Sequence, residues 1–457
     1  MSKKNSKPSE TKLRKTHLVG FETEMLILEE NGAISSLADE LIEKAEQAKL
    51  PYPVHKEYAH NMVEISSAPN VKLTKVAHGW LQSAKKLINI AKDLGLRLYP
   101  YGTYTGTHVP TTRTDRYYRM CEDILGPEKY TMSTGRVMGF HLHYTLPYGT
   151  FNQQNKSLKH LFNSRYKEQL LNLYNSAIAM DPAVSNFMES SPFVDGVFTA
   201  NDSRLFLYRA MRTGTGSKMI RGLYYDYPMF GRLPRYKATI SDLILLIERR
   251  HNTWKEMVEE RHPEYIDIVE SKHPLQFNWG PVRINRAGTI EYRGMDMNLP
   301  SNIIGTSLLI KYFLNKVRRD ELIIRPSDIG IKEPFKIEDQ IVHVPPYGYL
   351  SEVLQYKSAL YGMQDDEVYR YTKNLTAIAM KEVPMKKDPS IDRLNKMLAN
   401  RKTKSDEILE YVKKEGHIIS EKLDETFARE FALRGCDELE IEVDQLLDSE
   451  LAIDLEE

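Results

Sequence analysis

Two glutamates inside one short apolar run place the strongest constraint on how this chain folds. The run covers residues 18–28, and its carboxylates, Glu22 and Glu24, stand two positions apart. Alternate side chains of a β-strand point to opposite faces, so a strand here puts both carboxylates on one face and apolar side chains on the other. Two like charges in apolar surroundings are unfavourable unless a cation balances them. The run therefore predicts a strand that faces a metal-binding cleft.

The same alternation occurs in two distant segments, residues 137–146 and 289–293. In each segment one face is apolar or aromatic, and the other carries groups of the kind that bind metal or phosphate. Three strands would thus present such groups from one side of a single sheet. The groups on the second and third segments are His141, His143, Glu291 and Arg293.

A further short strand, residues 61–67, carries Glu64. Another carboxylate, Glu57, stands seven positions before Glu64. Hard carboxylate oxygens suit Mg²⁺ or Mn²⁺ better than zinc. So many acidic groups together favour more than one metal ion, as in phosphoryl transfer from ATP. His143 fits either a group behind the ligands or a satisfied core histidine. The predicted metal ligands are Glu22, Glu24, Glu57, Glu64, His141 and Glu291.

Phosphate chemistry also needs cations that neutralise the developing negative charge. Arg293, on the Glu291 face, and Arg204 are the candidates for this role. The Gly-rich run 212–218, which ends in Lys218, is either a phosphate cradle or a plain mobile loop, because it lacks the residue order of a P-loop.

The composition restricts the class of protein. Of the 457 residues, 41% are hydrophobic and 28% are charged, which is ordinary for a soluble globular protein. No apolar run is long enough to cross a bilayer, and the N-terminus lacks the apolar core of a signal peptide, so we expect a cytoplasmic protein with no membrane partner. The formal net charge of zero gives no reason to expect nucleic acid as a partner. Oligomeric state is left open.

The order of the elements predicts an α+β fold with a curved, largely antiparallel sheet, helices on one face and the site on the open face. Helices are expected over 36–48, 75–94, 158–179, 240–260, 302–320, 350–380 and 405–433, and a hairpin over 282–293. The expected organisation is a disordered basic arm (1–15), a catalytic part (16–320), a helical C-terminal part (321–436) and an acidic tail (437–457). The tail either docks on a protein surface or frays.

Five motifs occur in the order that is typical of glutamate-cysteine ligase family 2, and the chain resembles that family over roughly residues 16–320. Each motif is weak alone, but the five in order are specific. They are Gly20-Phe-Glu22-Thr-Glu24; Glu57 with Val63-Glu64-Ile65; Gly139-Phe-His141-Leu-His143; Ser191-Pro-Phe193 with Ser203-Arg204; and Glu291-Tyr-Arg293-Gly-Met-Asp296-Met-Asn298.

The resemblance implies a fold like that of the glutamine synthetase and guanido kinase catalytic domain. It also implies an ATP-dependent carboxylate-amine ligase that forms an amide, typically γ-glutamyl, through an acyl phosphate. The six acidic and histidine residues would bind two or three Mg²⁺ ions, and Arg204 and Arg293 would contact nucleotide or substrate. The substrates would be a glutamate-like carboxylate and an amine. Two alternatives stay open: a metallohydrolase that uses His141 and His143, and a non-catalytic nucleotide-binding relative.

Overall fold

An antiparallel sheet of seven strands forms the centre of the computed structural model, which describes residues 17–160, 164–214, 219–383 and 388–449. The strand order is β12-β13-β5-β1-β3-β2, and β4 pairs with the far end of β1. The strands are β1 (Val19–Glu29), β2 (Val54–Lys56), β3 (Met62–Ser66), β4 (Leu96–Tyr99), β5 (Gly139–Thr145), β12 (Val282–Asn285) and β13 (Thr289–Asp296).

Strand β1 is the hub of this sheet, because it pairs with β5, β3 and β4 along its length. Its odd-numbered side chains from Val19 to Ile27 form one buried face, where Phe21 packs edge-on against Phe140 with ring centroids 5.5 Å apart. On the same face, the Trp80 indole donates a hydrogen bond to Thr23 Oγ1 at 2.8 Å. The strand that the two glutamates predicted is therefore present, with one face in the core.

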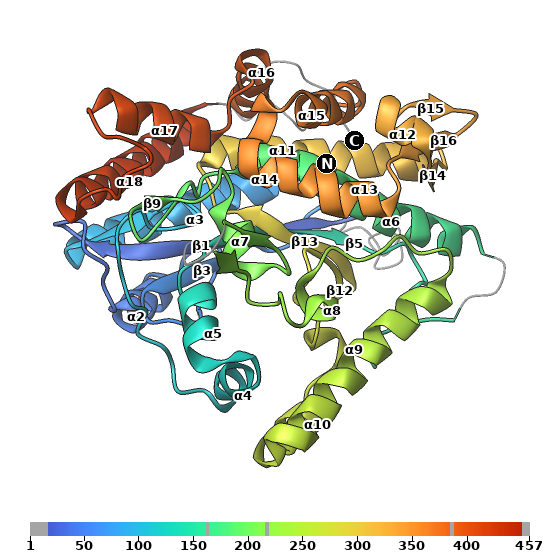
Figure 1. Ribbon diagram of the computed structural model, residues 1–457, viewed down its shortest axis with the longest axis horizontal. Helices are drawn as coiled ribbons and strands as arrows, with labels where there is room; N and C mark the ends of the chain where they lie inside the picture. Colours follow the sequence, from blue (N-terminus) through green and yellow to red (C-terminus); the bar gives the residue numbers. More distant parts are fainter. Residues whose placement is uncertain (1–16, 161–163, 215–218, 384–387, 450–457) are drawn as a thin grey trace, which may run out of the picture.

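Three long helices cover this buried face: α3 (Leu73–Asp93), α6 (Arg165–Met188) and α11 (Pro300–Arg319). In Figure 1 they lie above the sheet, and α4 (Arg116–Leu125), α5 (Pro127–Thr134), α9 (Ile240–Arg261) and α10 (Ile266–Ser271) extend below it. The predicted α+β class, with helices on one face of an antiparallel sheet, is confirmed. None of the helices in the described ranges has the length and apolar character that crossing a bilayer requires.

Helix α6 differs from its prediction over 158–179. It starts at Arg165, because Phe151–Asn152 and Ser157–Leu158 pair as the hairpin β6–β7 and the Ser164 hydroxyl caps the helix. It continues to Met188 because the second half is buried on all sides. A helix buried all round has no amphipathic period, so the pattern loses its signal there.

A bulge interrupts β13 between Tyr292 and Met295. Arg293 and Gly294, which stand opposite the single residue His141 of β5, turn their carbonyl oxygens toward the guanidinium groups of Arg204 and Arg209, which donate hydrogen bonds of 3.4 and 2.8 Å. A bulge bends a strand and redirects a side chain. Here it brings Arg204 up to the open face of the sheet.

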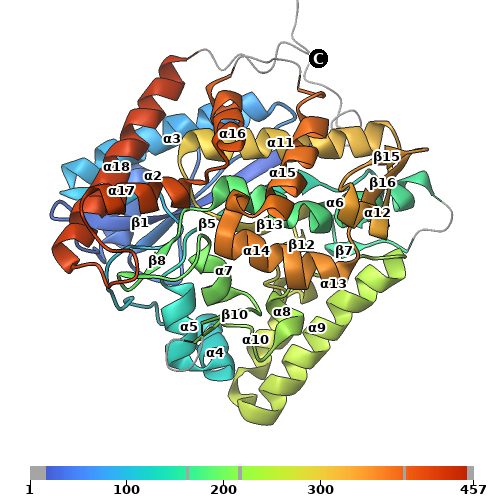
Figure 2. The same cartoon turned by 45° about the horizontal axis from the view of Figure 1, so that its top comes forward.

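The C-terminal part adds a small sheet and a layer of helices on top of α6 and α11 (Figure 2). The small sheet holds β14 (Ile323–Pro326), β16 (Ile341–Val344) and β15 (Ile337–Glu338) in that order. The helices of this layer include α14 (Gln355–Tyr361), α15 (Asp366–Ala379), α16 (Pro389–Asn400), α17 (Lys404–Lys414) and α18 (Glu425–Asp448).

The acidic segment after residue 436 is not frayed in its described part. Its residues as far as Asp448 continue helix α18, which packs on α3 and β4. Arg97 pairs with Asp437 at 2.6 Å and with Glu440 at 2.9 Å, and Lys85 pairs with Asp444 at 2.6 Å. The boundary expected at residue 437 thus falls inside a helix, and residues 450–457, like the basic arm, lie outside the described residues.

Candidate active site

Neighbouring strands bring the predicted ligands together on the face of the sheet opposite α3, α6 and α11. Across the ladder Glu22 is paired with His141, Glu24 with Glu64, and Glu291 with His143. Glu57 directly follows the edge strand β2. Residues from five separate segments of the chain thus meet in one cluster, as the shared strand pattern predicted.

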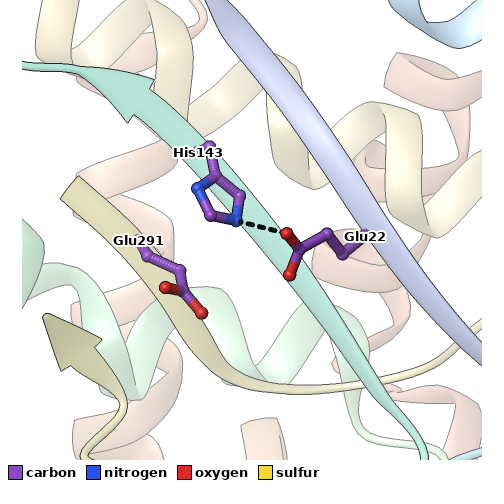
Figure 3. A group of neighbouring side chains, drawn as sticks. All are labelled: Glu22, His143 and Glu291. Atoms are coloured by element: carbon purple, nitrogen blue, oxygen red, sulfur yellow. Dashed lines mark ion pairs between the residues drawn. The ribbon is translucent and has the colours of Figure 1, made fainter. Parts of the chain in front are cut away.

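The donor atoms form three overlapping groups, and within each group they lie within 4.8 Å of one another. The first group is all carboxylate, the second joins β1, β3 and β5, and the third joins β1, β5 and β13 (Figure 3). The first and second groups share Glu64, and the second and third share Glu22. The three groups therefore form a continuous line, which we call the donor row. It consists of Glu24, Glu57 and Glu64; Glu22, Glu64 and His141; and Glu22, His143 and Glu291.

His143 is a member of the donor row that the sequence pattern left ambiguous. Its Nε2 lies 3.2 Å from Glu22 Oε1, on the side of the sheet away from the helices (Figure 3). The signal was available in the spacing, because residues two apart in a strand share a face. What the spacing could not supply was the pairing of β5 with β13, which puts His143 beside Glu291.

Charge is unevenly compensated along the donor row. Burial raises the pKa of Glu64 to about 8, and the nearby carboxylates of Glu22 and Glu24 add to this rise. Burial also raises the pKa of Glu57 well above its ordinary value, with Glu24 and Glu64 next in effect. Burial opposes ionisation of Glu22 too, but hydrogen bonds and charge from His141 and His143 outweigh it and hold the pKa of Glu22 well below its usual range. At the all-carboxylate end, Glu57 and Glu64 therefore lack a compensating positive charge.

Two arginines already balance Glu291, which is completely buried. Arg283 Nε donates to Glu291 Oε2 at 2.6 Å, as does Asn285 Nδ2 at the same distance, and Arg293 Nη1 lies 3.2 Å from Oε1. These arginines outweigh burial and keep the pKa of Glu291 well below its usual range. Arg293 was predicted at this position. Arg283 was not, because only the register of β12 against β13 places it opposite Glu291.

Arg204 is a buried guanidinium whose charge interacts with the buried carboxyls of Asp202 and Asp296. It is 5% exposed, at the start of α7 (Ser203–Tyr208), and in the described part of the chain it forms no ion pair. Its Nη2 donates to Arg293 O at 3.4 Å, its charge lies 5.8 Å from the Tyr208 ring centroid, and its Nε has no hydrogen-bond partner. A Cβ on Gly139 would lie 2.4 Å from Arg204 Nη2, so that glycine leaves room for the guanidinium. Lys218 lies outside the described residues.

Two clefts border the donor row. The larger, of about 840 Å³, is bordered by Glu22 and His143 and by the segments 145–154 and 285–289. The smaller, of about 240 Å³, is bordered by Glu24, Glu57 and the three arginines, and most of its other lining residues are aromatic. The aromatic residues are Tyr58, Tyr117, Tyr118, Tyr130, Tyr208 and Trp279.

The donor row fits divalent cations. His141 is 3% exposed, and its Nε2 has no hydrogen-bond partner and points at Glu24 Oε1, 3.6 Å away. A buried nitrogen without a partner and carboxyl groups with raised pKa values both indicate a missing positive charge. Carboxylate oxygens with one or two imidazoles suit Mg²⁺ or Mn²⁺.

The sequence signature of glutamate-cysteine ligase family 2 matches residues 18–320, a span that contains every residue of the donor row. The chain belongs to this family. Its members are carboxylate-amine ligases, enzymes that form C–N bonds. No curated protein is matched by sequence.

Two solved structures are similar in fold at low sequence identity. A glutamate-cysteine ligase from Francisella tularensis, solved in complex with AMP, is 13% identical with a TM-score of 0.52, over 95% of this chain and 92% of its own. A bifunctional glutathione synthetase from Pasteurella multocida is 12% identical with a TM-score of 0.51, over 93% of this chain. The chain spans only 53% of the length of that synthetase.

Proposed function

We propose that this member of the family is an ATP-dependent carboxylate-amine ligase that uses Mg²⁺, or Mn²⁺ in its place. It would activate a carboxylate, in the first instance the γ-carboxylate of glutamate, as an acyl phosphate, and an amine would then displace phosphate to form an amide. One observation carries the proposal. The donor row borders two clefts, and the buried guanidinium of Arg204 lines the smaller cleft and forms no ion pair with the described residues.

The size and lining of the two clefts favour a division of ligands between them. The cleft of about 840 Å³ is within the range that holds a ligand the size of a nucleotide, and it opens directly on Glu22 and His143. The AMP complex of the Francisella ligase, which shares this fold, supports a nucleotide as one ligand. The smaller cleft, which three arginines line, suits the carboxylate substrate and the incoming amine.

Each group of side chains then has a task. The row of carboxylates and imidazoles would hold the divalent cations, which neutralise the triphosphate and the transferring phosphoryl group. Arg204 would bind the oxygens of the substrate carboxylate or of the phosphoryl group joined to it, where burial strengthens the attraction. Arg283 and Arg293 hold Glu291 in place and keep it ionised. Positioning and charge supply the rate enhancement in such a site.

A direct test measures ADP release with glutamate and with a panel of amines, added together and separately. We expect release only when both substrates are present, and Glu24→Ala or Glu291→Ala should abolish it. Glu29→Ala is the matched control, because Glu29 is an exposed carboxylate at the end of the same strand β1. ATP turnover that needs no second substrate and survives both site changes would contradict the proposal.

Nucleotide binding can be tested before any substrate is known. Ligand at a hundred times its dissociation constant adds about 2.7 kcal/mol to the free energy of unfolding. We expect a rise in thermal midpoint with ATP and Mg²⁺ together. The amine panel then identifies the acceptor.

A further inference from the structure

A buried ion pair lies beside the bulge of β13. Its members are Arg209, the residue that follows α7, and Asp181, in the second half of α6, and each is 3% exposed. Arg209 Nη1 donates to Asp181 Oδ2 at 2.8 Å, and Arg209 Nη2 donates to Oδ1 at 3.1 Å. Two parallel bonds between a guanidinium and a carboxylate fix the orientation of both groups as well as their distance.

The same guanidinium binds the backbone of the bulge. Arg209 Nη2 also donates to the carbonyl oxygen of Gly294 at 2.8 Å. A Cβ on residue 294 would overlap that nitrogen and would lie 2.9 Å from Asp181 Oδ1, so this close approach requires glycine. The preceding carbonyl, Arg293 O, accepts from Arg204 at 3.4 Å. Two arginines near the two ends of α7 thus bind neighbouring carbonyl groups of the bulge.

A third side chain comes from the C-terminal part of the chain. Gln355, the first residue of α14, is 2% exposed, and its Nε2 donates to Asp181 Oδ2 at 2.7 Å. Helix α14 packs on α6, and α6 contacts β13 (Figure 2). Residue 355 lies beyond the span 18–320 that the family signature matches. The C-terminal part is therefore linked to the bulge through Asp181 and Arg209, and we call these three residues the Arg209 network.

The bulge carries groups of the smaller cleft. Arg293 lies in the bulge and Arg204 binds its backbone, and both guanidinium groups line that cleft. Within the described ranges, the three members of the Arg209 network line neither cleft. Their route to a bound substrate is therefore through the bulge and α7.

Stability alone is a poor explanation for an ion pair at this position. Removing two charges from water costs free energy that their attraction often does not recover, and apolar replacements of similar volume are frequently neutral or stabilising. What apolar side chains could not supply is the hydrogen bond to Gly294 O and the direction that it gives to the bulge. Orientation of the bulge accounts for the Arg209 network better than stability does.

We propose that Arg209, Asp181 and Gln355 are positioning residues, which hold the bulge of β13 so that Arg204 and Arg293 face the carboxylate substrate. The C-terminal part of the chain thereby contributes to substrate binding without touching the substrate. The inference rests on the proposed function for the identity of that substrate, whereas the effect on the bulge does not depend on it.

A double variant separates positioning from stability. Asp181→Leu together with Arg209→Met removes both charges at once and fills a similar volume, so we expect the chain to fold. The variant leaves Gly294 O without its donor. Gln355→Met keeps the length of the side chain and removes only the amide. Thermal midpoints check that each variant is folded.

The matched control is a second ion pair between the catalytic and C-terminal parts. Lys316, on α11, lies 3.0 Å from Glu382, and neither residue lines a cleft in the described part of the chain. Lys316→Met together with Glu382→Leu should leave the bulge and the kinetics unchanged.

Hydrogen exchange measures the bulge without any substrate. We expect peptides that cover residues 293–297 to exchange at least about fivefold faster in the double variant and about twofold faster in Gln355→Met. Peptides from β1 should keep the wild-type rate. A loss of global stability would instead raise exchange in both regions, because global unfolding exposes all the amides together.

Kinetics measure the consequence for the substrate. In the double variant we expect the KM for the carboxylate substrate to rise about tenfold, with kcat changed less than about twofold. The KM for ATP should stay at the wild-type value. A purely structural role would lower the fraction of active protein, and therefore kcat, without changing either KM.

Four results would overturn the inference. They are wild-type exchange over residues 293–297 in the double variant, faster exchange there with an unchanged KM for the carboxylate, a lower kcat with both KM values unchanged, and effects of the same size in the control pair. If the double variant does not fold, the same measurements on Gln355→Met decide. A wild-type chain that makes no amide contradicts the proposed ligase, and the dissociation constant of glutamate, measured by calorimetry, then replaces KM.

Discussion

The two faces of the central sheet come from the same strands and have opposite properties. On the helix side, Phe21, Phe140 and Leu142 are almost completely buried in the core under α3, α6 and α11. On the open side, His141, Arg204 and Arg293 each keep a buried nitrogen without a hydrogen-bond partner. Burying charge costs free energy unless a partner compensates it. The helix side therefore supplies the stability of the fold, and the open side is incomplete until ligands bind.

The largest expected effect lies on the helix side. Phe140→Ala removes a ring that packs against Phe21, and we expect it to lower the free energy of unfolding by about 3–5 kcal/mol. Denaturant unfolding measures the loss, and Phe140→Leu should lose less because it leaves a smaller cavity. A loss below about 1 kcal/mol for the alanine variant would mean that this face does not carry the stability.

Substitutions on the open side should lower the ligase activity and leave the free energy of unfolding largely unchanged. Glu24→Gln removes a charge from the all-carboxylate end of the row, and we expect the ligase rate to fall at least about 100-fold. The metal-free protein should be as stable as the wild type or more stable, because like-charge repulsion decreases. Steady-state kinetics and metal-free unfolding curves test this, with Glu29→Gln as control. A variant that unfolds like Phe140→Ala but keeps its rate would erase the distinction between the faces.

A smaller effect is expected from a side chain added at Gly139, a residue of strand β5 beside Arg204. In Gly139→Ala the new Cβ would lie 2.4 Å from Arg204 Nη2, so the guanidinium must move. We expect the KM for the carboxylate substrate to rise about tenfold, since a displacement of about 1 Å is costly in a catalytic site. Gly348→Ala is a suitable control, because a Cβ there meets no atom within 4 Å. An unchanged KM would mean that Arg204 does not bind this substrate.

The smallest effect is a dependence of stability on pH. The folded Glu64 carboxyl, with a pKa of about 8, keeps its proton at pH 7, whereas the unfolded one, with the ordinary value of 4.5, is ionised. The folded state therefore binds more protons, and its stability falls as the pH rises toward 8. For Glu64 alone the expected loss between pH 7 and pH 8 is about 1 kcal/mol in the metal-free protein.

Unfolding curves of the metal-free protein at pH 7 and pH 8 measure this loss. The slope should be smaller in Glu64→Gln, and Mg²⁺ should stabilise the wild type more at pH 8 than at pH 7. A flat or rising metal-free profile would mean that the carboxyl groups of the open side are already compensated.

Local patterns were sufficient for the strands of the site. Glu22, Glu24, Glu64, His141 and Glu291 could each be assigned to the polar face of a short strand, because alternation has a period of two and needs no partner. The ends of α6 could not be predicted in the same way, since burial on every side removes the period. The bulge at Arg293 and Gly294 could not be predicted either, because the alternating pattern of the residues before it is regular.

The amino-acid sequence by itself determined which residue types face one side of each strand, and its ordered motifs indicated the family. Only the tertiary structure decided that His143 lies beside Glu291, that Arg283 balances Glu291, and that Arg204 reaches the row over Gly139. The physical reason is that register and strand order come from packing between segments far apart in the chain. The period of the sequence determines which face of a strand a side chain occupies, whereas strand pairing determines which residues lie next to that side chain.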